Sequence, residues 1–168
     1  MSKKDTIILI GMPGSGKSTV GVVLAKAMGC RFLDSDLLIQ EVTGKLLHEI
    51  IRDDGLEFFQ SIEEQVNSEI VTDHAIIATG GSVVYGKRAM EHFKQMGTII
   101  YLKVSLESIA ERLGSLTERG VAIKDGYSLS DLYEERRPLY EMYADIIIDE
   151  GNLSIRETVK YIKEKLKR

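Results

Sequence analysis

The residues best suited to chemistry form a glycine-rich run near the start of the chain, Gly11-Met12-Pro13-Gly14-Ser15-Gly16-Lys17-Ser18. This run matches the pattern G-x-x-x-x-G-K-[ST]. Glycines let backbone N–H groups converge on phosphate oxygens, and the helix that follows adds unpaired N–H groups and a positive dipole end. Lys17 is expected to reach the β- and γ-phosphates, and the Ser18 hydroxyl to ligate Mg²⁺. The nucleotide contacts are predicted to come from Gly11, Gly14, Ser15, Gly16, Lys17, Ser18 and Thr19.

A pair of carboxylates follows the next apolar run, in Asp34-Ser35-Asp36. One carboxylate near the phosphates can hold Mg²⁺, which keeps part of its hydration shell in proteins. The other can orient or accept the proton of an acceptor hydroxyl. The alternative is purely structural, because Asp is also a common helix N-cap and first-turn residue.

Length and composition narrow the class of nucleotide-binding protein. A GTPase would need an N-K-x-D segment, and neither Asn67 nor Asn152 sits in one. A motor or AAA-type ATPase would need a much longer chain than 168 residues, which suits a single domain. The net charge of −4 argues against a nonspecific nucleic-acid binder. A small phosphotransferase remains.

Alternating apolar runs and amphipathic segments must position these residues. Strands are predicted at 7–10, 31–33, 75–79, 98–102 and 146–148. Helices are predicted at 17–28, 37–53 (broken near Gly44), 55–71, 87–95, 106–113, 129–143 and 155–166. Residues 114–126 read as a functional or mobile loop. This alternation predicts an α/β fold with a parallel sheet, helices on both faces and ligands at the carboxyl ends of the strands.

Taken together, the motifs of the chain resemble those of the shikimate kinase family. They keep the family's order and spacing from about Ile7 to the C-terminal helix. The matching segments are the glycine-rich run, Phe32–Asp36, Gly55 with Phe59 and Glu63, Ala78–Gly81, and Leu132 through Pro138 to Asp145. The resemblance implies a three-layer P-loop kinase fold with a five-stranded parallel sheet. It also implies acceptor-binding helices at about 35–71 and a mobile lid at about 113–126.

The same resemblance implies an activity, namely ATP- and Mg²⁺-dependent phosphorylation of the 3-hydroxyl of shikimate. Asp34 would then lie on the metal side, and Asp36 would contact the acceptor hydroxyl. The backbone N–H groups of Gly80 and Gly81 would line the acceptor site. Arg136 would bind the carboxylate of the acceptor as a planar fork.

Two further arginines match positions of the family. Arg112 would lie against the adenine, and Arg119, in the lid, would move onto the transferring phosphoryl group. Catalysis would then depend on Lys17, Asp36 and Arg119.

Three positions depart from the family. Gln60 replaces the arginine that pairs with the carboxylate of shikimate, and the loss of such a charge-assisted bond costs about 1.5–3 kcal/mol. Ser82 replaces a third glycine beside the acceptor, and Gly120 replaces the lid proline. Two of the changes fall on the acceptor side, where Gln60 and Ser82 are predicted to contact substrate. Three hypotheses follow: a shikimate kinase with a divergent pocket, a paralogue acting on another hydroxy acid such as homoserine or a sugar acid, or a non-catalytic nucleotide-binding protein.

Composition also bears on location and partners. Cys30 is the one cysteine, so no internal disulfide can form, and a reduced, cytoplasmic compartment is expected. The apolar run before Gly11 is too short for a signal peptide or a membrane span. We expect a monomer that binds ATP and a small, carboxylate-bearing hydroxy compound, and neither nucleic acid nor membrane.

Overall fold

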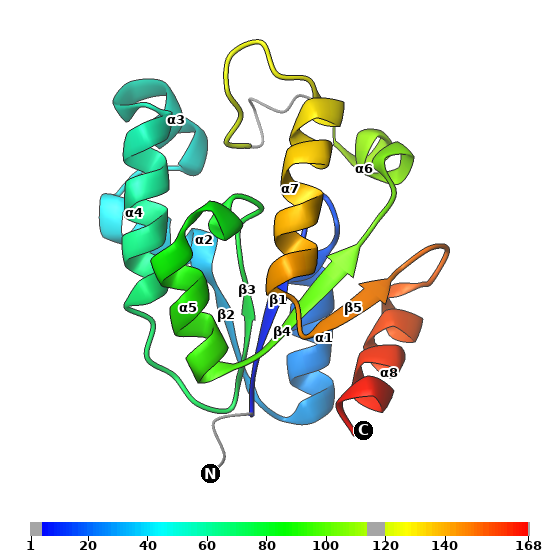
Figure 1. Cartoon of the computed structure of the whole chain (residues 1–168). Helices are drawn as coiled ribbons and strands as arrows, with labels where there is room; N and C mark the ends of the chain where they lie inside the picture. Colours follow the sequence, from blue (N-terminus) through cyan, green and yellow to red (C-terminus); the bar gives the residue numbers. More distant parts are fainter. Residues whose placement is uncertain (1–4, 114–119, 168) are drawn as a thin grey trace.

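A computed structural model of the chain describes residues 5–113 and 120–167 (Figure 1). Five parallel strands form one sheet in the order β2-β3-β1-β4-β5. The strands are β1 (Thr6–Ile10), β2 (Arg31–Asp34), β3 (Ala75–Ala78), β4 (Gly97–Lys103) and β5 (Ile146–Asp149). Every residue of β1 and β3 is buried, as expected for central strands covered on both faces. The predicted five-stranded parallel sheet is therefore confirmed.

Helices cover both faces of this sheet (Figure 1). Ile7 and Leu9 of β1 pack in a core with α1 and α8, whereas Ile8 and Ile10 pack in a second core with α5 and α7. This alternation follows from the two-residue period of a strand. The helices concerned are α1 (Lys17–Met28), α5 (Lys87–Met96), α7 (Leu129–Tyr143) and α8 (Ile155–Leu166).

Three helices lie together beyond the β2 edge of the sheet: α2 (Ser35–Thr43), α3 (Leu47–Asp54) and α4 (Leu56–Ser68) (Figure 1). They enclose a third apolar cluster around Ile39, Ile50 and Phe59. The predicted break near Gly44 is present, since Gly44 ends α2 with a φ of 69°. The helix predicted at 55–71 is shorter than expected and ends at Ser68.

Two short elements complete the described chain, a 3₁₀ turn, η1 (Val83–Tyr85), and α6 (Leu106–Arg112). Residues 120–126, from the segment predicted as a loop, contain neither helix nor strand. Residues 114–119, which include Arg119, lie outside the described residues. No helix within 5–113 or 120–167 combines the length and apolar character needed to cross a membrane.

Candidate nucleotide and acceptor site

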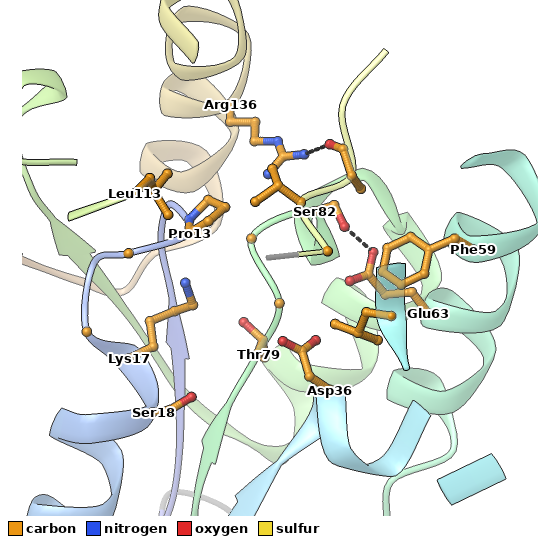
Figure 2. Close-up of a pocket in the computed structure, with 18 of the residues that line it drawn as sticks. Pro13, Lys17, Ser18, Asp36, Phe59, Glu63, Thr79, Ser82, Leu113 and Arg136 are labelled. Carbon is orange, nitrogen blue, oxygen red and sulfur yellow. Dashed lines mark hydrogen bonds between the residues drawn. The ribbon is translucent and has the colours of Figure 1, made fainter. Parts of the chain in front are cut away.

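The site lies at the carboxyl ends of the strands, where a cavity of about 430 Å³ opens between the glycine-rich loop, α2, α4 and α7. Figure 2 shows Lys17, Asp36, Glu63 and Arg136 around this space. Most of the predicted site residues line it: Gly14, Gly16, Lys17, Ser18, Thr19, Asp36, Gly80, Gly81, Ser82 and Arg136. The fold thus brings the predicted nucleotide side and the predicted acceptor side into one cavity.

The glycine-rich loop has the backbone that a phosphate cradle requires. Gly11 has a φ of 152°, and a Cβ there would lie 2.7 Å from the carbonyl oxygen of Leu102. Glycine is therefore needed both for the backbone conformation and for the close approach to β4. The loop lies between β1 and α1, which is the context that supports the motif.

Lys17 is a buried cation directly beneath this loop. Its Nζ donates to the carbonyl oxygens of Gly11, at 2.7 Å, and Met12, at 2.9 Å. It also donates to the Ser15 hydroxyl, at 3.4 Å. Burial lowers the pKa of Lys17 to about 8, although the nearby charge of Asp36 opposes this effect. Gly11 and Ser15 therefore do not line the cavity themselves. They accept hydrogen bonds from Lys17, which lines it.

Ser18 and Asp34, the two residues predicted to hold Mg²⁺, contact each other through their side chains. The Ser18 hydroxyl donates to Asp34 Oδ2 at 2.8 Å, and Asp34 Oδ1 accepts from the Asp36 backbone N–H at 3.0 Å. The structural alternative is confirmed, because Asp34 is the N-cap of α2 and Asp36 lies in its first turn. The cap uses one oxygen of Asp34, and the other oxygen faces Ser18 of α1, so capping does not exclude the predicted metal role. A hydroxyl and a carboxylate side by side suit Mg²⁺, which prefers oxygen ligands and fills its octahedron with water and phosphate oxygens.

The acceptor side contains two carboxylates, those of Asp36 and Glu63, that line the cavity. Asp36 Oδ1 and Glu63 Oε2 are enclosed and lack a hydrogen-bond partner among the described residues. Burial raises the pKa of Asp36 to about 6 and that of Glu63 to about 7. Ser82 donates to Glu63 Oε1 at 2.6 Å (Figure 2). The hydroxyl of Ser82 is thus directed at Glu63.

Glu63 has no site role in the sequence prediction. The sequence contained a sign of such a role, because Glu63 lies four residues after Phe59 on the apolar face of α4. A carboxylate is unusual on such a face unless it has a partner or a function. Only 3% of Glu63 is exposed, and such burial of a carboxylate needs a partner or a function.

Arg136 is the buried cation of the acceptor side, with 1% of its surface exposed. It lies in α7, where Leu132 and Tyr140 on the same face fix it against the sheet. Its Nη2 donates to the Ala122 carbonyl oxygen. No carboxylate among the described residues forms an ion pair with it, so its charge is available to an anionic ligand.

Gln60 lies differently from the other predicted acceptor residues. It lines two smaller neighbouring cavities, of about 270 and 150 Å³, and not the main one. Arg112 is exposed at the end of α6, and its Nη1 donates to the Gly14 carbonyl oxygen at 3.1 Å. Arg112 therefore lies beside the phosphate loop.

Comparisons with known proteins agree with this geometry. A sequence model of the shikimate kinase family matches residues 13–167. Shikimate kinase of Thiobacillus denitrificans is 36% identical over 170 residues, which cover 99% of this chain and 92% of the relative. Shikimate kinase of Mycobacterium avium is 37% identical over 164 residues, or 95% and 92% of the two chains.

Solved structures give the same result. Shikimate kinase from Acinetobacter baumannii in complex with shikimate superposes with a TM-score of 0.84 at 29% identity, covering 96% of this chain and 92% of that one. Shikimate kinase from Aquifex aeolicus superposes with a TM-score of 0.82 at 31% identity, covering 96% of each. A deoxyadenosine kinase from M. mycoides, at 16% identity and a TM-score of 0.61, shares the fold alone. The family model, the near-complete coverage and the geometry of the cavity together show that this chain belongs to the shikimate kinase family.

Proposed function

We propose that this chain transfers the γ-phosphoryl group of ATP to the 3-hydroxyl of shikimate, giving shikimate 3-phosphate and ADP. One observation carries the proposal: a single cavity joins a phosphate loop to the buried Arg136 and to two carboxylates. Within residues 5–113 and 120–167, Arg136 forms no ion pair, and each carboxylate has one oxygen without a hydrogen-bond partner. Shikimate offers a carboxylate for the arginine and ring hydroxyls for the carboxylates. Membership of the family supports the same acceptor.

On the donor side, the loop amides and Lys17 bind the phosphates. Lys17 lies beneath the loop, and its Nζ would exchange hydrogen bonds to the Gly11 and Met12 carbonyl oxygens for bonds to the phosphates, where its charge stabilises the transferring group. Ser18 and Asp34 would hold Mg²⁺, whose charge offsets that of the β- and γ-phosphates. By the resemblance, Arg112 would contact the adenine and Arg119 the transferring phosphoryl group.

On the acceptor side, Asp36 orients the hydroxyl that is phosphorylated and accepts its proton. A pKa of about 6 leaves Asp36 mostly ionised at pH 7 and close enough to neutrality to act as a base. Gly80 and Gly81 lie between the loop and the carboxylates, and a Cβ at Gly81 would come within 2.6 Å of Pro13. The absence of side chains there lets the acceptor approach the phosphate loop.

The proposal is tested by ADP release in the presence of shikimate, homoserine or gluconate in parallel, with mass-spectrometric identification of the product. We expect turnover with shikimate and product at the mass of shikimate 3-phosphate. Preferred turnover of homoserine or gluconate would identify the chain as a paralogue for another hydroxy acid. Nucleotide binding without any turnover would identify a non-catalytic protein.

We also propose that the enzyme acts as a cytoplasmic monomer. The sole cysteine suits a reduced compartment that supplies ATP. Light scattering after size exclusion tests the oligomeric state, for which a mass near 18.8 kDa is expected.

A further inference from the structure

Two neutral oxygen atoms fix the guanidinium of Arg136 on one side. Its Nε donates to the Tyr85 hydroxyl at 3.4 Å, and its Nη2 donates to the Ala122 carbonyl oxygen. Its Nη1 lies beside Gly81, where an added Cβ would be 3.0 Å away. Because Gly81 lines the main cavity, the edge formed by Nη1 and Nη2 is the one left for an acceptor.

Tyr85 makes two different contacts with this guanidinium. The Cζ of Arg136 lies 5.3 Å from the centre of the Tyr85 ring, within the range of a cation–π interaction. The Tyr85 hydroxyl donates to Glu135 Oε1 at 2.6 Å, so its lone pairs remain free to accept from Arg136 Nε. Tyr85 therefore restrains both the plane and the rotation of the guanidinium.

Glu135 strengthens this arrangement from behind Tyr85. The hydroxyls of Tyr85 and Tyr127 each donate to one of its oxygens, and these two bonds hold the pKa of Glu135 below its usual range. A charged acceptor polarises the Tyr85 hydroxyl and improves it as an acceptor for Arg136. Glu135 itself forms no ion pair with Arg136 within the described residues, so Glu135 does not neutralise its positive charge.

The position of Gln60 explains why the orientation of Arg136 by Tyr85 matters for acceptor binding. Gln60 and Tyr85 line the same two small cavities beside the main one, and Glu135 lines the smaller of the two. Gln60 is neutral and does not line the main cavity, so Arg136 is the buried guanidinium that the described residues offer to an acceptor. A single arginine binds a carboxylate well only if its donor edge is correctly oriented.

We propose that Tyr85 is a positioning residue for the acceptor. It holds Arg136 so that Nη1 and Nη2 bind the acceptor carboxylate end-on, and one arginine then suffices in a chain that carries glutamine at position 60. This inference rests on the proposed function, because it requires an acceptor with a carboxylate.

The test compares shikimate with its methyl ester as acceptors for the wild-type chain and for Tyr85→Phe. The phenylalanine keeps the ring and removes the hydroxyl. For shikimate, we expect kcat/KM to fall about five- to tenfold, mainly through KM, because the hydrogen bond lost orients a charged group. For the uncharged ester, and for KM of ATP, we expect changes within about twofold.

Tyr127→Phe is the matched control. Tyr127 donates to the other oxygen of Glu135, and no hydrogen bond between Tyr127 and Arg136 is found in the described chain. We expect its preference for shikimate over the ester to equal that of the wild type. If Tyr85→Phe fails to fold, as judged by its Tm, Glu135→Gln decides, because it should reduce the same preference while leaving the Tyr85 ring in place.

Equal losses for shikimate and the ester in Tyr85→Phe would overturn the inference and leave the proposed function intact. An equal effect of Tyr127→Phe would also overturn it, because Tyr85 would then have no separate role. A wild-type chain that does not turn over shikimate would overturn the proposed function and this inference together.

Discussion

Asp36 and Glu63, which come from different helices, each direct one carboxylate oxygen at the same side of Gly80, and neither oxygen has a hydrogen-bond partner in the part of the chain that the structure describes. A Cβ built on Gly80 would lie 2.8 Å from Asp36 Oδ1 and 2.8 Å from Glu63 Oε2. Two acceptor oxygens therefore meet over a residue that has no side chain. An acceptor with neighbouring hydroxyl groups can donate to both oxygens at once.

Gly80→Ala tests this relationship. The added methyl group would push at least one carboxylate away, and a displacement near 1 Å can cost on the order of a hundredfold in rate. We expect kcat/KM for shikimate to fall by about that factor while the affinity for ATP stays close to wild type. A comparable loss of ATP affinity, measured by calorimetry, would contradict the assignment of Gly80 to the acceptor side.

Asp36→Asn should remove the acceptor of the hydroxyl proton. We expect kcat to fall by about 10²–10⁴, with little change in ATP binding. In the wild type, the pKa of about 6 predicts that kcat/KM for shikimate falls as the pH drops below 6, because protonated Asp36 cannot accept a proton. The acid limb of the pH–rate profile should be absent from the residual activity of the variant, and a limb that persists would assign it to another group.

Glu63→Gln should make the folded chain more stable at alkaline pH and weaken the binding of shikimate. The pKa of Glu63 in the folded chain, about 7, lies above its ordinary value of 4.5, so the folded state binds more protons between these two pH values. The contribution of Glu63 to the free energy of unfolding therefore falls as the pH rises from about 4.5 to 7. At pH 8 the neutral glutamine should raise this free energy by on the order of 2 kcal/mol and also raise KM for shikimate.

Urea denaturation at pH 5 and pH 8 measures this effect. Glu57→Gln is the matched control, because Glu57 is exposed on the same helix and should change stability little at either pH. Equal effects of the two substitutions would show that burial of Glu63 carries no stability cost.

Lys17 should take up a proton when ATP binds at alkaline pH. Burial holds its pKa at about 8, whereas phosphate oxygens favour its charged form. At pH 8 we expect uptake of up to about half a proton per site, measured by calorimetry in buffers of different ionisation enthalpy. Lys17→Met should abolish both this uptake and turnover, and proton uptake that survives in the variant would come from a different group.

The acceptor side could be predicted only in part. Gly80, Gly81 and Ser82, predicted from the pattern after β3, line the cavity, and so does Arg136, predicted from the segment around Pro138. Gln60 was expected at the acceptor because an arginine at the matching family position is there. In the folded chain Gln60 lines two smaller cavities beside the main one. Which cavity Gln60 faces depends on how α4 packs and not on the sequence of α4 alone.

The sequence by itself determined the donor half of this protein. The strand–loop–helix around Gly11 to Thr19 is local, since the glycines, the lysine and the helix start all lie within nine consecutive residues, and local geometry follows from local residues. The apolar runs likewise determined a parallel sheet, because strands buried on both faces need apolar side chains throughout.

Only the tertiary structure decided how the acceptor half is built. Asp36, Glu63, Gly80 and Arg136 belong to four separate segments, and their distances depend on how α2, α4 and α7 pack around the ends of β2 and β3. The contact of Tyr85 with Arg136 spans 51 positions of sequence. Such relations arise from the packing of whole elements, which no short pattern of residues encodes.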